Sequence, residues 1–404
     1  MGQNSYIFRQ LCQCLEQDHF EMLVKRYDGN KGIRSFSCWN FLLAMVWSHL
    51  TNRKSLRDIE ISLRSHSDKL YRMGIGKGVS KSNMAYSLAN RNVDIFREHA
   101  AFMMECASHV SPKCHELAEI AAEFNMNGFF AIDSSTIYLD LDKYPWSTPQ
   151  AGKGGMKLHT MYDLLRQVPA MAIITGHERR DQSLMDDYEY RQGCLYTFDK
   201  AYVKTNSLYR INHTGAWFVV RLKDHMRYDV LDDNTLPEGM RGAVRSDRNI
   251  RFAGQIASRN YPDTLRLVDF HSEENDMDLK FLTNNVNLPA LTIALAYKHR
   301  WDIEVFFKWM KQHLHIEAFY GTSPNAVMIQ LFTAIISFCM LVLVADYNNF
   351  KGTPFDLSRL LSTTLLERAS LVDVMSRLDG MNELVPVAST VPSLFDQPNV
   401  TYKL

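Results

Sequence analysis

The chain has 404 residues, which at roughly 150 residues per domain predicts two or three domains and at least one large core. Apolar residues make up 46% and charged residues 22%, a globular mixture that excludes wholesale disorder and low-complexity architecture. Lys plus Arg (45) equals Asp plus Glu (45), so any attraction to nucleic acid must come from the local distribution of charge.

The cysteines and the apolar runs indicate the kind of cellular compartment in which the protein is expected. The seven cysteines form no CxxC pair and have no regular spacing, which argues against a disulfide framework or a zinc ribbon and favours a reducing compartment. Residues 1–13 lack the pattern of a signal peptide. The apolar run 331–345 contains Thr333 and Ser337 and falls short of the roughly 20 residues that span a bilayer. We therefore expect a buried helix there, and no membrane partner.

The first part of the chain is helical in pattern and locally basic. Residues 5–50 carry helix-like apolar spacing, and between Arg53 and Arg97 ten Lys or Arg stand against four acids. Within this basic segment the pattern predicts a helix over 55–63, a glycine turn over 74–78 and a second helix over 80–92 with Ser80 as its N-cap. This is the outline of a helix-turn-helix that reads DNA, and a solvated basic face on a helical bundle is the alternative.

The middle of the chain is strand-like and then alternates. We expect strands over 128–132, 136–141, 156–164, 169–175, 195–198 and 217–222, with helices near 183–191 and 205–212. Alternation of strand and helix indicates parallel strands joined by crossovers. We expect residues 227–287 to be β-rich, with strands near 250–256, 265–270 and 279–283. Pro289 opens a long helix that is predicted to reach about His315.

Two acids directly follow apolar runs of this region. Asp133 follows 128–132, and Asp199 follows 195–198. The carboxyl end of a buried strand is where α/β sheets place their sites. An aspartate there is also a common turn former or helix cap, so these two positions alone do not establish a site.

The long helix carries a charged stripe. At 100° per residue, its members fall within an arc of about 60°, and apolar residues occupy the other side. The stripe consists of Tyr297, Arg300, Glu304 and Lys311. A surface helix with an Arg/Glu pair at i, i+4 gives the same pattern, so the spacing alone does not decide between a site and a solvated face.

The stripe resembles a family signature. Tyr297-x2-Arg300-x3-Glu304-x6-Lys311 is similar to the Y-R-E-K signature of DDE transposases of the insertion-sequence-four group. In this resemblance Asp133 matches the first acid of the family, Asp199 the second and Glu304 the third. The resemblance covers about 125–340, and residues 1 to about 75 resemble the small N-terminal domain of one branch of these transposases.

The resemblance implies an α/β fold with a ribonuclease-H-like catalytic core, a β-rich insertion and an N-terminal all-helical domain. The expected segments are 1–120 (helical, DNA-binding), 125–226 (core, first part), 227–288 (β-rich insertion), 289–345 (core, second part, with the signature helix) and 346–404 (C-terminal helical region and tail).

The resemblance also implies an activity, cut-and-paste transposition of an insertion sequence. Asp133, Asp199 and Glu304 would be catalytic and bind two Mg²⁺ or Mn²⁺ ions, because hard divalent ions suit carboxylates and phosphate. The enzyme would hydrolyse DNA at the element's ends, through a hairpin intermediate in this group, and transfer the 3′-hydroxyls to target DNA. A homodimer on paired inverted repeats, in the bacterial cytoplasm and associated with the nucleoid, is expected. A nuclease of the same fold without strand transfer, or an inactive DNA-binding regulator, are the alternatives.

Six residues are candidate DNA contacts. Arg300 and Lys311 would face the phosphate backbone, and Tyr297 would contact a phosphate near the cleaved end. Arg300 is also placed to form an ion pair with Glu304. Trp301 would either stack on a base or belong to the core, and Lys157 and His159 would either contact DNA or be ordinary strand residues.

Overall fold

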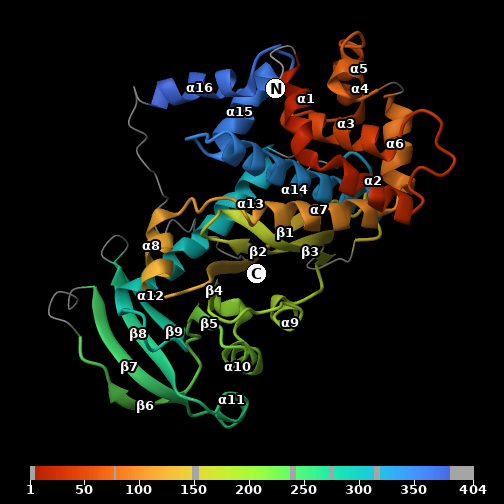
Figure 1. The fold of residues 1–404 in the computed structure, drawn as a ribbon. Coiled ribbons are helices and arrows are strands. Elements are labelled where there is room, and N and C mark those ends of the chain that lie inside the picture. Colours follow the sequence, from red (N-terminus) through yellow and green to blue (C-terminus); the bar gives the residue numbers. More distant parts are fainter. Residues whose placement is uncertain are drawn as a thin grey trace.

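A nine-stranded sheet runs through the molecule, with strand order β3-β2-β1-β4-β5-β9-β8-β7-β6 (Figure 1). The structure, a computed structural model, describes residues 5–76, 79–147, 154–236, 243–272, 276–313 and 319–382. The strands are β1 (Gly128–Leu139), β2 (Gly154–Asp163), β3 (Val168–Gly176), β4 (Cys194–Phe198), β5 (Trp217–Arg221), β6 (Tyr228–Asp233), β7 (Val244–Phe252), β8 (Leu265–Ser272) and β9 (Met277–Thr283). The predicted α/β class is confirmed.

Helices from both ends of the sequence form one layer beside this sheet (Figure 1). They are α1 (Ile7–Leu11), η1 (Cys12–Leu15), α2 (Gln17–Arg26), α3 (Cys38–Leu50), α4 (Leu56–Arg64), α5 (Leu70–Met73), α6 (Lys81–Asn90), α7 (Val93–Ala107), α14 (Pro324–Tyr347), α15 (Pro354–Thr364) and α16 (Leu371–Asn382). The backbone N–H of Ile7 donates to the carbonyl of Glu367 at 3.1 Å, which ties the start of α1 to the turn after α15. The helical part is therefore not built from 1–120 alone.

The apolar run predicted to be a buried helix lies within α14. By length and composition α14 could cross a membrane, but 94% of its most apolar window is buried inside the protein. It packs against α7, α3, α6 and α1. The prediction of a buried helix is confirmed, and α14 is the central helix of the helical layer.

The helix-turn-helix outline is present in the described residues. The Ser80 hydroxyl accepts a hydrogen bond from the backbone N–H of Asn83 at 3.2 Å, so Ser80 caps α6 as predicted. Ser55 caps α4 in the same way, and α4 packs against α6. Gly74 ends α5 at φ +87°, a conformation that favours glycine, whereas residues 77 and 78 of the predicted turn lie outside the described residues.

The central strand β1 is longer than predicted. The sequence suggested two strands with a break after Ile132, but β1 continues without interruption to Leu139 because antiparallel pairing with β2 runs from Phe130 to Leu139. Parallel pairing with β4 ends at Ile132 and Phe198. Asp133 therefore lies within a strand, at the point where the parallel partner strand ends.

Apolar side chains leave β1 on both faces of the sheet. Phe129 and Ala131 join the core beneath the helical layer, and Phe130 and Ile132 join a second core. The second core is covered by α9 (Asp181–Leu184), α10 (Thr205–His213) and α11 (Gln255–Asn260). Burial on both faces explains the continuous apolar run of the sequence.

The predicted long helix from Pro289 is broken at the signature. It consists of α12 (Ala290–Lys298), a 3₁₀ turn η4 (His299–Trp301) and α13 (Asp302–His313). Asp302 and Glu304 occupy the first turn of α13, where carboxylates favour a helix start. The prediction of one continuous helix was wrong, and its expected end near His315 lies outside the described residues.

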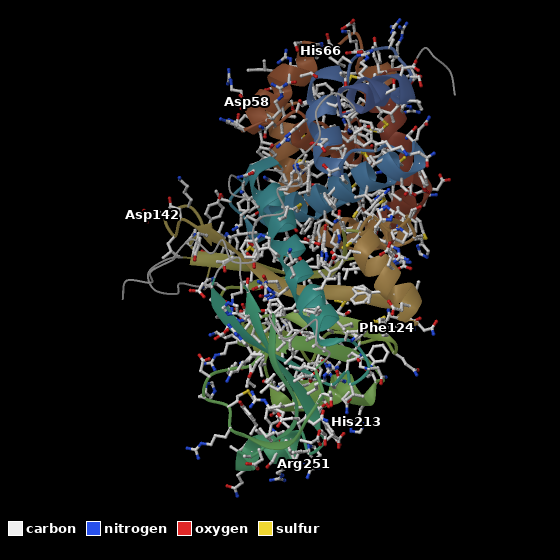
Figure 2. The ribbon with its side chains drawn as sticks, turned by 90° about the vertical axis from the view of Figure 1, so that its left-hand side faces the viewer. Asp58, His66, Phe124, Asp142, His213 and Arg251 are labelled. Carbon is white, nitrogen blue, oxygen red and sulfur yellow. The ribbon has the colours of Figure 1, made fainter. Side chains whose placement is uncertain are left out.

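The β-rich segment continues the core sheet. β9 pairs antiparallel with β5, and β8, β7 and β6 follow it outward. The strand expected over 250–256 is the end of β7, which stops at Phe252 before α11 begins at Gln255, and the helix expected near 183–191 is only the short α9. The molecule is elongated, with Asp58 and His66 of the helical layer at one end and Arg251 of β7 at the other (Figure 2).

Candidate active site

Asp133 and Asp199 lie on neighbouring strands. The parallel register of β1 and β4 ends at Ile132 opposite Phe198, so the two aspartates occupy the next position on each chain. Paired strands are about 4.8 Å apart, which brings these residues side by side. The Asp199 carboxylate also accepts a hydrogen bond from the N–H of Ala201 at 3.2 Å, so it caps the 3₁₀ turn η2 (Lys200–Tyr202) as well.

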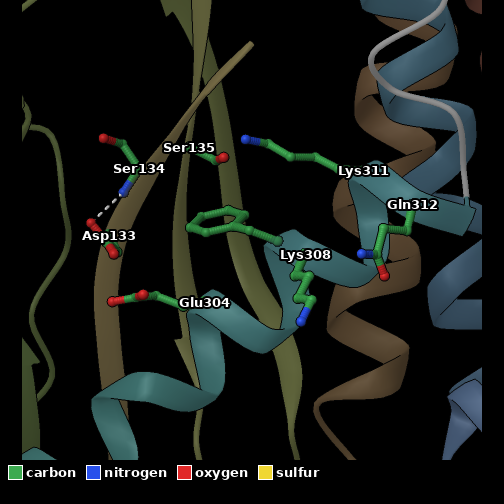
Figure 3. A pocket seen from close by; sticks show the side chains of 8 residues that line it. Asp133, Ser134, Ser135, Glu304, Lys308, Lys311 and Gln312 are labelled. Atoms are coloured by element: carbon green, nitrogen blue, oxygen red, sulfur yellow. Dashed lines mark hydrogen bonds between the residues drawn. The ribbon is translucent and has the colours of Figure 1, made fainter. Parts of the chain in front are cut away.

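Arg300 joins Asp133 to Glu304. Its guanidinium lies 3.4 Å from the Asp133 carboxylate (Nη1 to Oδ2) and 2.8 Å from the Glu304 carboxylate (Nη2 to Oε1). Figure 3 shows Glu304 reaching from α13 toward Asp133 on β1. The predicted ion pair between Arg300 and Glu304 is present, and it extends to the first of the predicted acids.

The pKa of Asp133 is raised, and burial is the largest cause. Burial raises its pKa, the Arg300 guanidinium and the N–H of Ser134 lower it, and the charges of Glu304 and Asp199 raise it again, to about 7. Both of the other predicted acids thus act electrostatically on Asp133. A carboxyl group in this position would be ionised more readily beside a further cation.

A hollow of about 610 Å³ opens beside Asp133 and Glu304. Its lining combines these acids with one aromatic side chain, Phe307, and with cationic and polar side chains: Ser134, Ser135, Lys308, Lys311 and Gln312. Lys311 extends from α13 toward β1 (Figure 3), and its contact with the phosphate backbone stays a prediction. Lys308 was missed from sequence, although its position one turn beyond Glu304 was a usable signal.

Tyr297 is placed differently from the prediction. Its side chain is buried, and its ring centre lies 4.8 Å from that of Phe281 and 5.7 Å from the guanidinium carbon of Arg300. A direct phosphate contact is therefore not supported, and Tyr297 instead packs against Arg300. Trp301 is half-buried in η4, and its role stays a prediction.

Lys157 and His159 belong to a polar network behind β1. Lys157 Nζ and Ser134 Oγ both lie within hydrogen-bonding distance of Asp181 Oδ1, at 3.1 and 3.0 Å. His159 is fully buried and hydrogen-bonds Thr175, and burial lowers its pKa to about 4. The structure favours the strand-residue interpretation for His159. Asp181 was missed from sequence, since an acid in a four-residue helix carries no distinctive pattern.

His299 was also missed, and it fixes the signature turn. Its Nδ1 lies 3.0 Å from Asp302 and its Nε2 3.1 Å from Glu116 of α8 (His115–Glu123). Burial lowers the pKa of His299, but the hydrogen bonds to Asp302 and Cys114 outweigh burial and raise it to about 10. The imidazolium therefore connects the break between α12 and α13 to α8.

Residues 126–340, more than half of the chain, match a family model described as a transposase DDE domain. The chain belongs to the DDE transposase family. All of the predicted acids and the whole signature fall inside the matched range, so the resemblance noted from sequence is confirmed at the level of the family. Membership of the insertion-sequence-four group stays a prediction. Residues 3–76 match a domain of unknown function (DUF4372).

Individual relatives agree with the family match. A Sinorhizobium fredii protein that carries the name of a transposase, y4zB, is 32% identical over 231 residues, 57% of this chain and 64% of that protein. This chain thus spans less than two thirds of that relative. A Synechocystis protein named as a transposase for insertion sequence element IS4SA is 34% identical over 368 residues, 89% of this chain and 98% of that protein. A cryo-EM structure of a piggyBac transposase synaptic complex with hairpin DNA has a TM-score of 0.41 and 12% identity, covering 89% of this chain and 78% of that one.

The DDE transposase family implies a divalent metal ion, and the chemistry of the acids fits one. Among the described residues no three His, Cys, Asp or Glu side chains are gathered closely enough to hold a metal. Asp133 and Glu304 nevertheless already share one cationic group, the guanidinium of Arg300. Two carboxylates that converge on one cation, with a third on the adjacent strand, provide the oxygen donors that hard divalent ions prefer.

Proposed function

We propose that this DDE transposase carries out cut-and-paste transposition of an insertion sequence, with Asp133, Asp199 and Glu304 as its catalytic acids. The observation that supports this most directly is the convergence of Asp133 and Glu304 on Arg300, with Asp199 at the adjoining strand position. Acids from two strands and one helix that are distant in sequence would have no reason to converge in a protein that only packs or only binds.

Asp133, Asp199 and Glu304 would hold two Mg²⁺ or Mn²⁺ ions. Bound there, such ions supply activation of the attacking oxygen and stabilisation of the leaving oxygen in an in-line displacement at phosphorus. Arg300 lowers the pKa of Asp133 against the effect of burial, and its contacts with both carboxylates orient Asp133 and Glu304 toward each other. Lys308 and Lys311, which line the hollow with them, hold the phosphates of the DNA strand that is cut.

The DNA partners are the terminal inverted repeats and the target. The basic segment from Arg53 to Arg97, with α4 and α6 as its helices, recognises the repeats, and phosphate contacts make that affinity dependent on salt. Two ends must be cut in concert, so a homodimer forms on the paired ends. In this proposal the five segments predicted from sequence divide DNA binding and catalysis between them. α14 belongs to both the DNA-binding part and the core part.

The test uses the purified chain and duplexes that carry the inverted repeats flanking its reading frame. With Mg²⁺ or Mn²⁺ present, Asp133→Asn, Asp199→Asn and Glu304→Gln should each reduce end cleavage by roughly a hundredfold or more. Asp142→Asn, at an exposed position away from the acids, should cleave like the unchanged chain. Near-normal cleavage by any of the three acid variants would show that the assignment is wrong.

A strand-transfer assay separates the alternatives. Pre-cut ends incubated with target DNA should yield joined products. Cleavage without joined products would identify a nuclease of the same fold, and the absence of any metal-dependent nicking would identify a DNA-binding regulator.

A further inference from the structure

A second hollow, of about 890 Å³, opens next to Asp199. Its walls come from the start of α10, the turn between β5 and β6, and the start of α11. Four cationic or titratable basic side chains line it: Lys204, Lys223, His225 and Arg227. No acidic residue lines it among the residues that the structure describes. Lys204 is paired with Asp186 at 2.6 Å, so the excess positive charge comes mainly from Lys223 and Arg227, and it favours an anionic occupant.

This basic hollow is connected to the candidate active site through the backbone. Asp199 caps η2, and the chain continues directly from η2 into Val203, part of the wall of the hollow. The Val203 carbonyl accepts a hydrogen bond from Lys223 Nζ at 3.0 Å. Burial lowers the pKa of Lys223 and the nearby charge of Asp199 raises it, which shows that the lysine and the acid act on each other.

The start of α10 adds backbone donors to the same wall. This nine-residue helix opens at Thr205, and no side chain caps its N-terminus. Thr205 and Asn206 both line the hollow. Uncapped N–H groups and the helix dipole favour the same kind of anionic group that the lysines and Arg227 favour.

An exposed apolar residue lies at the rim. Ile256, in the first turn of α11, is 76% exposed and lines the hollow beside Gln255. A free small anion would leave this side chain in water. A nucleic acid offers phosphates to the cations and the faces of sugars and bases to an isoleucine, so it fits the whole lining better.

We infer that the basic hollow binds the sugar-phosphate backbone of a DNA segment that extends past Asp199, away from the hollow that Asp133 and Glu304 line. This inference rests on the proposed function, because it takes the three acids as the point at which the strand is cut. The segment comes either from the element's end or from target DNA, and both present the same phosphodiester chemistry.

DNA binding without divalent metal tests the inference separately from catalysis. Arg227→Gln should weaken binding about threefold to tenfold and reduce the slope of log affinity against log salt by about one, as expected for one lost phosphate contact. Lys351→Gln, an exposed lysine between α14 and α15 that lies outside both hollows and outside the 1–120 segment, removes the same charge and should change neither quantity. Thermal melting of each variant confirms that it is folded, and Lys223→Gln repeats the measurement at a second position.

Two probes identify the source of the DNA. One is a duplex of the inverted repeat, and the other is a duplex of unrelated sequence. A loss confined to the first assigns the hollow to the element's end, a loss confined to the second assigns it to target DNA, and a loss on both assigns it to either backbone. If Arg227→Gln and Lys223→Gln bind both duplexes with unchanged affinity and salt slope, the inference is overturned, whatever the acid variants do in the cleavage assay.

Discussion

Arg300 is a buried residue that contacts several other residues of the candidate site. Its side chain is only 9% exposed, and it meets the carboxylates of Asp133 and Glu304 and the ring of Tyr297. Its Nε has no hydrogen-bond partner, so the guanidinium depends on the carboxylates to offset its desolvation. The aromatic and the arginine of the signature are thus used inside the protein, to hold acids.

Removing Arg300 should destabilise the chain by leaving Asp133 buried without its cation. We expect Arg300→Gln to lower the free energy of unfolding by about 3–5 kcal/mol at pH 9, where Asp133, whose pKa is about 7, is ionised in the unchanged chain; this is the usual result of breaking one side of a buried ion pair. Adding Asp133→Asn should recover part of this loss, because it removes the stranded charge. Urea denaturation of the two single variants and the double variant gives the coupling energy. Strictly additive effects would contradict this account of the pair.

At the scale of elements, the break between α12 and α13 is the feature that decides the site. The sequence placed Tyr297, Arg300, Glu304 and Lys311 in one stripe, and the 3₁₀ turn His299–Trp301 lies within it. Tyr297 and Arg300 are buried, whereas Glu304 and Lys311 line the hollow, and Arg300 still pairs with Glu304 one turn farther on. His299 holds the turn through Asp302 and Glu116.

The pH dependence of this turn follows from His299. Its pKa is raised from 6.5 to about 10 in the folded chain, so the protonated form stabilises the fold fully below pH 6.5 and loses this effect as the pH rises through about 10. The unchanged chain should therefore be more stable than His299→Gln by about 1–3 kcal/mol at pH 6, with the difference declining by pH 10.

Denaturation of both proteins at pH 6, 8 and 10 measures this difference. His109→Gln, at an exposed histidine in the turn after α7, serves as the matched control and should show no such trend. A difference between the chain and His299→Gln that grows from pH 6 to pH 10 would contradict the assignment.

The sequence predicted the elements well where one local signal dominates. The Ser80 cap and the buried α14 follow from a capping residue and an apolar run, and both are confirmed. The break in β1 was wrongly predicted because Asp133 looks like a strand end, whereas pairing with β2 carries the strand through it. The 3₁₀ turn was not predicted, and one of the contacts of its His299 is with Glu116, which lies far from it in sequence.

The side chains that contact the acids could not be predicted from local sequence patterns either. Position along the strands and helix identified Asp133, Asp199 and Glu304 as candidates, but nothing in the spacing indicated that Arg300 would be buried between two of them. Asp181, which holds Lys157 and Ser134, has no sequence signal because its role depends on side chains from β1 and β2. Tertiary contacts decide such roles, and they are made by residues far apart in the chain.

At the scale of the whole molecule, α14 packs the helical layer and the core together. Most of it, up to residue 340, lies within the range matched by the DDE domain, yet it packs mainly against α7 and α3 from the first part of the chain. Nineteen of its residues are buried, most of them apolar. A fully buried Leu, Ile or Phe contributes about 1.5–3 kcal/mol, so exposing one side of this helix would cost more than the net stability of a typical domain.

A fragment of residues 121–382 should therefore fail to fold as a soluble monomer. It keeps the nine-stranded sheet and all three acids, but it lacks the helices α1 to α7, which cover α14. We expect aggregation, or a compact state that binds a hydrophobic dye and has lost its near-ultraviolet circular dichroism. Co-expression with residues 1–120 should restore a soluble complex, because the missing surface is supplied in trans. Size-exclusion chromatography with hydrogen exchange over α14 distinguishes these states, and a fragment that is monomeric, dye-free and protected at α14 would show that the core folds independently of the helical layer.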